Sequence, residues 1–373
     1  MERINWCILL FYTVITITKN ERIITIYYDT YRASRPAPLV HFPQEHVGLN
    51  YYINTYLPYS ILDKGFDLIN ESKHERIKNE NWFDSYHYIT TLKTDNVTIK
   101  DFSFNYIDTH ISEYRNKGLG FAHKYLNESF SIIHRLYSDK HIEHVLFSFE
   151  PHNKDGYIHF GGVPDNKHKE LPYEGIMKVN VNEEKWMTNF TGIEYEGRIF
   201  DINIPAVIHS GVFAMMFSDD LFDIMVKYIF NEAINNKECY NRLWDGMTIQ
   251  CREENKIKQM SNITFIFGNT KITYKMKDIF EDDLSSLFRS NPFEYKDHGL
   301  ILGIKFLRGF NYSIFNYEDN QIELYSDRIE MKTKEIEIIN RHSSLLIVMY
   351  ITIIILGLMV SIYINIVRCI KQY

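Results

Sequence analysis

The amino-acid sequence predicts a mainly β protein. Between its two ends, the chain consists of short runs in which apolar or β-branched residues alternate with polar ones, and Gly, Asn or Asp residues separate these runs. Alternation with a period of two is typical of strands that bury one face. Helical periodicity is confined to residues 126–139 and 219–235. The clearest strand-like runs cover residues 96–107, 144–151, 156–163, 263–276 and 310–326.

Length and charge limit the classes of protein to consider. The chain has 373 residues, of which 45% are hydrophobic, and this is enough for one large domain or for two lobes with separate cores. The formal net charge is −7, and the basic residues form no concentrated stripe. A nucleic-acid surface needs such a stripe, so we expect no nucleic-acid partner. Residues 327–344 are rich in charge and lack turn signals, which predicts a short stalk.

The two ends of the chain carry targeting signals. A polar start with Arg3 precedes a short apolar run, and this pattern predicts a signal peptide over residues 1–18. The alternative for this run is a buried first strand. Residues 345–367 carry no charge and would form a helix about 34 Å long, enough to cross a hydrocarbon core of about 30 Å. We therefore expect a transmembrane helix there, followed by a cytosolic stub at 368–373.

These ends together predict a single-pass type I protein of a secretory-pathway or cell-surface membrane, with its bulk lumenal or extracellular. Cys7 falls in the signal peptide and Cys369 in the stub, which leaves Cys239 and Cys251 as the one pair in an oxidising compartment. Glycosylation sequons support a lumenal location. They are centred on Asn70, Asn96, Asn127, Asn189, Asn262 and Asn311.

Two segments of the chain share the same pattern of residue types. Residues 49–62 and 204–217 each contain an apolar strand, one polar residue and then a hydroxyl residue. The polar residue and the hydroxyl residue are Asn54 and Thr55 in the first segment, and His209 and Ser210 in the second.

Six segments between about Asp95 and Ser326 form an ordered set. They are TDNVTIKDFSF, NKGLGFAHKYLNESFSIIHRLYSDKHIEHVLFSF, GYIHFGGVPDN, AVIHSG, CREENKIKQMSNITFIFGNTKITYKMKDIF and ILGIKFLRGFNYSIFNYEDNQIELY. In content and in order, these segments resemble the pepsin-like aspartic proteases, peptidase family A1. The resemblance implies a bilobal β fold with an N-terminal lobe at 19–150 and a C-terminal lobe at 151–326. It also implies a peptide-binding cleft between the lobes.

The resemblance places the two catalytic loops, and both are degenerate. AVIHSG stands where the second Asp-Thr/Ser-Gly belongs, so His209 replaces the second aspartate. In the segment INTYL, Asn54 occupies the first aspartate position. An alternative first loop, YYDTYRAS, keeps an acid at Asp29, but it leaves no room for the strands that normally precede the loop. The resemblance further implies that the hydroxyls of Thr55 and Ser210 hydrogen-bond across to the partner loop.

These substitutions bear on the chemistry. In this family two carboxylates share one proton, because like charges so close together cannot both ionise. One carboxylate accepts a proton from water while the other donates one to the scissile carbonyl. Asn54 does not titrate, and His209 beside an amide gives no shared-proton pair. We therefore expect a pseudoprotease that binds a peptide or protein in the interlobe cleft.

Two other interpretations stay open at this point. One is an active membrane-anchored endopeptidase that uses Asp29 or an unorthodox His209 site. The other is an unrelated β-rich surface antigen, which requires six ordered matches to be coincidence.

The resemblance also implies accessory features. The flap hairpin falls at residues 82–88, where Phe83 or Tyr86 would pack over the cleft, although the family's flap glycines are absent. Cys251 stands where the second-lobe disulfide of the family ends, so we expect a bond between Cys239 and Cys251. No second ligand stands at metal-site spacing from His209, and we expect no metal and no cofactor.

Overall fold

A computed structural model describes most of the body of the chain. The chain divides after Glu330 into two units, and all described residues except Met331 belong to the first unit. The predicted signal peptide and the predicted span at 345–367 both lie outside the described residues. The described residues are 23–29, 39–43, 48–55, 61–63, 74–77, 85–93, 98–107, 119–124, 131–152, 155–164, 174–212, 214–243, 247–280, 285–290 and 299–331.

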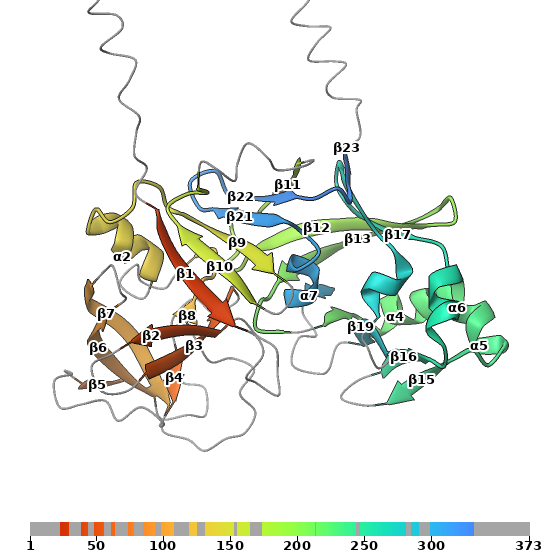
Figure 1. Ribbon diagram of the computed structural model, residues 1–373, viewed down its shortest axis with the longest axis horizontal. Coiled ribbons are helices and arrows are strands. Elements are labelled where there is room, and N and C mark those ends of the chain that lie inside the picture. The colour runs from red at the N-terminus through yellow and green to blue at the C-terminus, as the bar shows by residue number, and fades with distance from the viewer. Residues whose placement is uncertain are drawn as a thin grey trace, which may run out of the picture. The chain divides into compact units, whose positions relative to one another are not determined.

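The described strands form three sheets, so the mainly β prediction is confirmed (Figure 1). The first is a nine-stranded sheet that contains strands from both predicted lobes. The predicted lobe boundary at residues 150 and 151 falls inside its strand β9. In spatial order its strands are β11 (Glu174–Lys178), β22 (Gln321–Tyr325), β21 (Tyr312–Asn316), β9 (Leu146–His152), β10 (Asp155–Phe160), β1 (Ile24–Asp29), β2 (Leu39–Pro43), β3 (Gly48–Asn54) and β8 (Leu119–Gly120).

The second sheet has ten strands, all from the C-terminal part of the chain. In spatial order they are β15 (Cys239–Leu243), β16 (Met247–Cys251), β19 (Ser285–Ser290), β14 (Met215–Phe217), β20 (Leu300–Leu302), β13 (Arg198–Ile208), β12 (Met187–Tyr195), β17 (Ile263–Phe267), β18 (Thr270–Tyr274) and β23 (Ile329–Met331).

The third sheet has four strands and belongs to the N-terminal part. Their spatial order is β4 (Ile61–Asp63), β7 (Thr98–Ile107), β6 (Ser85–Lys93) and β5 (His74–Ile77). β6 pairs antiparallel with both β5 and β7. It is therefore an inner strand of this sheet.

The helices are short, and no helix in the described ranges is long and apolar enough to cross a membrane. Predicted residues 219–235 are helical throughout, as α4 (Asp219–Met225), a π-helical turn η2 (Val226–Phe230) and α5 (Asn231–Asn235). The other predicted helix is described only as α2 (Ile132–Ser138), which Ser131 caps. The remaining helices are α6 (Glu254–Gln259), the 3-10 turn η3 (Met276–Ile279) and α7 (Ile304–Leu307).

The central strands of the nine-stranded sheet are buried on both faces. Every residue of β21 is buried, although its sequence mixes apolar and polar residues. On one face Phe315 stacks on Phe147 with ring centroids 4.6 Å apart, inside the main apolar core. The opposite face carries Tyr312 beside Glu150 of β9. Burial of each large apolar side chain contributes about 1.5–3 kcal/mol to the free energy of folding. The apolar face of the nine-stranded sheet thereby stabilises the position of the polar residues on the opposite face.

Candidate functional site

Two loops meet through reciprocal hydrogen bonds between hydroxyls and backbone. The Thr55 N–H donates to Ser210 Oγ at 3.1 Å, and the Ser210 N–H donates to Thr55 Oγ1 at 2.9 Å. Thr55 Oγ1 in turn donates to the carbonyl of Ile208 at 2.9 Å. Thr55 and Ser210 are both fully buried. Each loop is thereby fixed by the other, so the two chain segments form one junction.

Parallel strand pairs hold both loops in place. β3 ends at Asn54, which is paired with Gly120 of β8, and β13 ends at Ile208, which is paired with Leu302 of β20. The His209 N–H continues the second pairing by donating to the Leu302 carbonyl at 3.0 Å. Asn54 and His209 thus stand at corresponding points, each at the end of a strand pair and directly before the hydroxyl residue of its loop. The side chain of Asn54 lies outside the described part of the structure.

Apolar packing supports the second loop. Residues 206–208 of β13 are buried, as expected for a continuous apolar run in an inner strand. The Ile304 N–H donates to the Val212 carbonyl at 2.7 Å and ties the start of α7 to the loop. The side chains that form a small cluster here are those of Met187, Val207, Val212, Met216 and Ile301.

The imidazole of His209 makes a contact that fixes its tautomer. His209 is fully buried, and the Gly211 N–H donates to its Nδ1 at 3.2 Å. A backbone N–H can only donate, so Nδ1 is an acceptor and carries no proton. We therefore assign the remaining ring proton of neutral His209 to Nε2. The loop thus presents an N–H donor from this residue where the family resemblance calls for an acid.

Asp29 occupies a different structural setting. It lies in β1, where it is paired with Asp155 of β10 and Leu39 of β2, both antiparallel. The hydroxyl that bonds Ser210 comes from Thr55. The residue that stands directly before this hydroxyl residue is Asn54, not Asp29.

The predicted flap is only partly described. β5 and β6 form an antiparallel hairpin, and the residues that connect them, 78–84, lie outside the described residues. Phe83 belongs to that connection. Tyr86 lies in β6, where its backbone is paired with Arg76 and Tyr106. Tyr86 is therefore a residue of a central strand, and its side chain lies outside the described set.

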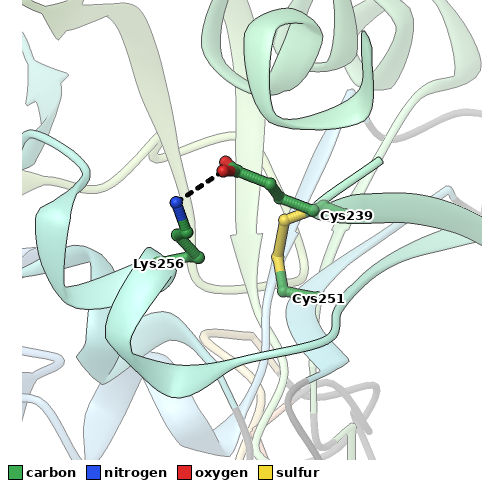
Figure 2. The surroundings of a disulfide bond; sticks show 4 residues. Cys239, Cys251 and Lys256 are labelled. Carbon is green, nitrogen blue, oxygen red and sulfur yellow. Dashed lines mark ion pairs between the residues drawn. A yellow bond between two sulfur atoms is a disulfide. The ribbon is translucent and has the colours of Figure 1, made fainter. Parts of the chain in front are cut away.

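The expected disulfide is confirmed. Cys239 and Cys251 are bonded, and they stand directly opposite each other in the antiparallel pair of β15 and β16 (Figure 2). Both residues are buried. Beside them, Lys256 of α6 forms an ion pair with Glu238 at 2.6 Å. These contacts join the edge of the ten-stranded sheet to α6.

Three of the six predicted glycosylation sequons lie in the described part of the chain. Asn189, Asn262 and Asn311 are exposed, so each side chain is accessible to modification. Asn70, Asn96 and Asn127 lie outside the described residues. Within the described ranges, no group of three His, Cys, Asp or Glu side chains could hold a metal ion.

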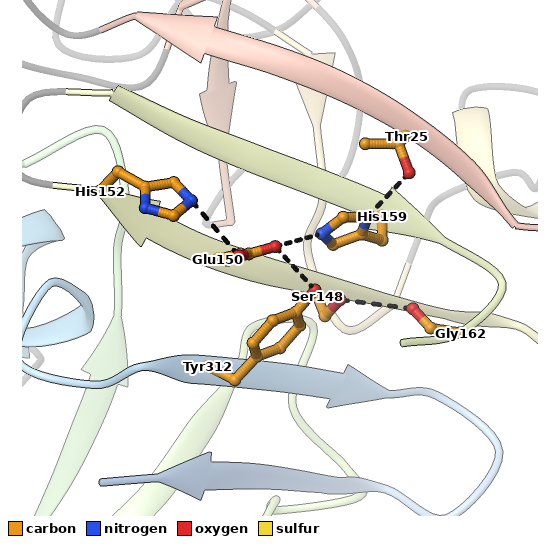
Figure 3. A network of polar contacts seen from close by, with 7 residues as sticks. All are labelled: Thr25, Ser148, Glu150, His152, His159, Gly162 and Tyr312. Carbon is orange, nitrogen blue, oxygen red and sulfur yellow. Dashed lines mark hydrogen bonds and ion pairs between the residues drawn. The ribbon is translucent and has the colours of Figure 1, made fainter. Parts of the chain in front are cut away.

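Sequence reasoning missed one buried polar cluster. Glu150 of β9 is 6% exposed, and it contacts His159 of β10 at 3.1 Å and Tyr312 of β21 at 3.3 Å (Figure 3). Burial raises the pKa of Tyr312 above its ordinary range, and the neighbouring Glu150 charge raises it further. The available signal was a Glu and a His within otherwise apolar strands, in FSFEP and GYIHF.

Comparison with known proteins decides the family. Residues 84–326, which are more than half of the chain, match the family model described as eukaryotic aspartyl protease. The chain belongs to this family. The interpretation as an unrelated β-rich surface antigen is therefore wrong. A search of curated protein sequences finds no match.

Solved structures share the pepsin-like bilobal fold. An aspartic proteinase from Irpex lacteus matches with a TM-score of 0.61 at 12% identity, over 82% of this chain and 97% of that chain. Basic 7S globulin from soybean matches with a TM-score of 0.64 at 8% identity, over 83% and 97%. Conglutin gamma, a basic 7S globulin from lupine seeds, matches with 0.64 at 10% identity, over 83% and 96%. At such low identity these likenesses show the fold alone.

Proposed function

We propose that this protein is a catalytically inactive eukaryotic aspartyl protease homologue that binds a peptide or protein between its lobes. It is anchored by residues 345–367 in a membrane of the secretory pathway or cell surface, with its bulk lumenal or extracellular. The observation that carries the proposal is the hydrogen bond from the Gly211 N–H to His209 Nδ1. This bond makes His209 an N–H donor at Nε2 in a loop where proteolysis needs an acid.

The proton chemistry supports inactivity. Peptide hydrolysis in this family needs one group that takes a proton from water and a second that gives a proton to the carbonyl. The amide of Asn54 does not titrate. The unprotonated nitrogen of His209 already accepts the Gly211 N–H, so using it as a base would break that contact. A pair of this kind shares no proton.

The preserved junction supports binding. Thr55 and Ser210 keep reciprocal hydrogen bonds although the residues before them carry no acid. The hydrogen bonds between the loops are present although neither loop carries an acid before its hydroxyl residue. This combination fits a protein whose cleft binds a ligand without cleaving it.

The alternative, an active endopeptidase that uses Asp29 or His209, has less support. Asp29 lies within an antiparallel ladder. The hydroxyl residue bonded to Ser210 follows Asn54. Moreover, the structures that share the fold include globulins as well as a proteinase, so the fold by itself does not favour activity.

A transition-state analogue tests the proposal. A statine-type inhibitor binds through a hydroxyl placed between two acidic groups, so it should bind an acidic pair far more tightly than an Asn–His pair. We expect no saturable binding to the purified full-length protein, and measurable binding to the double variant Asn54→Asp with His209→Asp. An array of extended peptides should retain the unmodified protein. Tight binding of the inhibitor to the unmodified protein contradicts the proposal.

A further inference from the structure

A line of three side chains crosses β1, β10 and β9 on the face of the nine-stranded sheet that carries Tyr312 (Figure 3). Thr25 of β1 lies opposite His159 of β10 in the antiparallel ladder. Thr25 Oγ1 is 2.9 Å from His159 Nδ1, and His159 Nε2 is 3.1 Å from Glu150 Oε2. None of these residues takes part in the contacts between Thr55 and Ser210.

The donors and acceptors in this line have a definite order. An ionised Glu150 carboxylate only accepts hydrogen bonds, so His159 donates to it from Nε2. The neutral ring then has an unprotonated Nδ1, which accepts the hydroxyl proton of Thr25. Tyr312 Oη also donates to Glu150 Oε2 and helps to hold the carboxylate in place. A hydroxyl, a base and an oriented carboxylate in hydrogen-bond sequence form the arrangement that activates a nucleophile.

The members of the line differ in their exposure to solvent. Glu150 and His159 are 6% and 3% exposed, whereas Thr25 is an exposed residue. Thr25 is therefore the accessible residue of the line, and the base and the carboxylate are buried. Beside the base, Tyr157 places its ring centroid 6.3 Å from that of His159 and is 38% exposed. This ring offers an aromatic surface for an acyl or aryl group.

We propose that Thr25, His159 and Glu150 form an esterolytic site that takes small carboxylic esters. Thr25 Oγ1 attacks the ester carbonyl while its proton moves to His159 Nδ1, and Glu150 stabilises the resulting imidazolium. The tetrahedral adduct expels the alcohol, which takes the proton from Nδ1. A water molecule then attacks the Thr25 ester in the same way and releases the carboxylic acid. The net reaction consumes one ester and one water and yields one acid and one alcohol.

The experiment uses the full-length protein and an alkyl fluorophosphonate as the probe. Attack by Thr25 Oγ1 forms a stable P–O bond, fluoride leaves, and His159 takes the hydroxyl proton. Peptide mass spectrometry should find the adduct on residue 25. Thr25→Val should carry no adduct there and Thr25→Ser should keep it. The matched control Thr191→Val, which removes a hydroxyl bonded only to backbone among the described contacts, should leave labelling of Thr25 unchanged.

Three further variants distinguish an activated Thr25 hydroxyl from one that is merely exposed. His159→Gln should slow labelling by about 10²- to 10⁴-fold, the usual range for loss of a general base. Glu150→Gln should slow it and move its half-maximal pH downward, because a neutral amide stabilises the imidazolium less, and Glu150→Asp should recover part of the rate. Other titratable groups that face Glu150 are Tyr312 of β21 and His152 of β9, whose Nε2 lies 3.3 Å from Glu150 Oε1. Thermal unfolding establishes which variants fold. Absence of an adduct on Thr25 overturns the proposal, as does equal labelling of a folded His159→Gln variant. If His159→Gln fails to fold, the test rests on the Thr25 variants: an adduct on residue 25 of Thr25→Ser and none on Thr25→Val support the proposal.

Discussion

Thr55 and Ser210 lie 155 residues apart in the sequence, and each accepts the backbone N–H of the other through its side-chain hydroxyl. This exchange joins the loop after β3 to the loop after β13. It holds the two loops together directly after Asn54 and His209.

Removal of one hydroxyl should therefore cost stability. Thr55→Val keeps the shape of the side chain but deletes the bonds to the Ser210 N–H and the Ile208 carbonyl. We expect the free energy of unfolding to fall by about 1–3 kcal/mol, because buried polar groups lose a partner. Urea denaturation measures this change. Thr55→Ser keeps the hydroxyl and serves as the control, and equal stability of the two variants would show that these bonds contribute little.

The disulfide should contribute a similar amount. Cys239 and Cys251 close a short loop with a sequence separation of 12. Chain entropy predicts a loss of about 3 kcal/mol in the Cys239→Ala, Cys251→Ala double variant. Thermal unfolding with and without a reductant measures it, and the reductant should leave the double variant unaffected. Mass spectrometry that finds both thiols free in the unreduced protein contradicts this expectation.

The sequence predicted the secondary-structure elements more completely than the contacts between distant strands. The helical segment 219–235 and the strand runs follow from side-chain periodicity, which acts over neighbouring residues. Thr55 and Ser210 were found through the order of motifs. The line from Thr25 to Glu150 was not found, because Thr25 and His159 lie 134 residues apart and meet only through the pairing of β1 with β10. Periodicity carries no information on which strands become neighbours.

Stability should fall at alkaline pH. Burial raises the pKa of Tyr312 and of Tyr274 above the ordinary value of 10.0, and the Glu150 carboxylate acts in the same direction on Tyr312. Above pH 10 the unfolded chain releases these phenolic protons while the folded chain retains them, so the free energy of unfolding decreases as pH rises. The contribution is complete below about pH 10 and is lost above it.

Urea denaturation across this range measures the effect, and tyrosinate absorbance reports the ionisation. Tyr312→Phe lacks one of the phenols and should show a shallower loss of stability with rising pH. An equally steep loss in this variant would assign the effect to other groups.

Membrane topology has its own test. If residues 345–367 are the only membrane span, a chain that ends before Ser343 should appear in the medium as a soluble glycoprotein. Cell fractionation and a mobility shift on deglycosylation measure this, and the full-length chain is the control. Retention of the shortened chain in membranes would mean that the N-terminal apolar run is an uncleaved anchor.

A peptide-cleavage assay shows whether this protein is catalytically inactive. The purified full-length protein is incubated with a diverse peptide library between about pH 4 and 7, where acid–base pairs of this family operate, and products are detected by mass spectrometry. We expect no cleavage, because Asn54 and His209 share no proton. Cleavage that disappears in His209→Ala would make His209 catalytic. Cleavage that disappears in Asp29→Ala would place the first catalytic loop at Asp29, and either result contradicts catalytic inactivity.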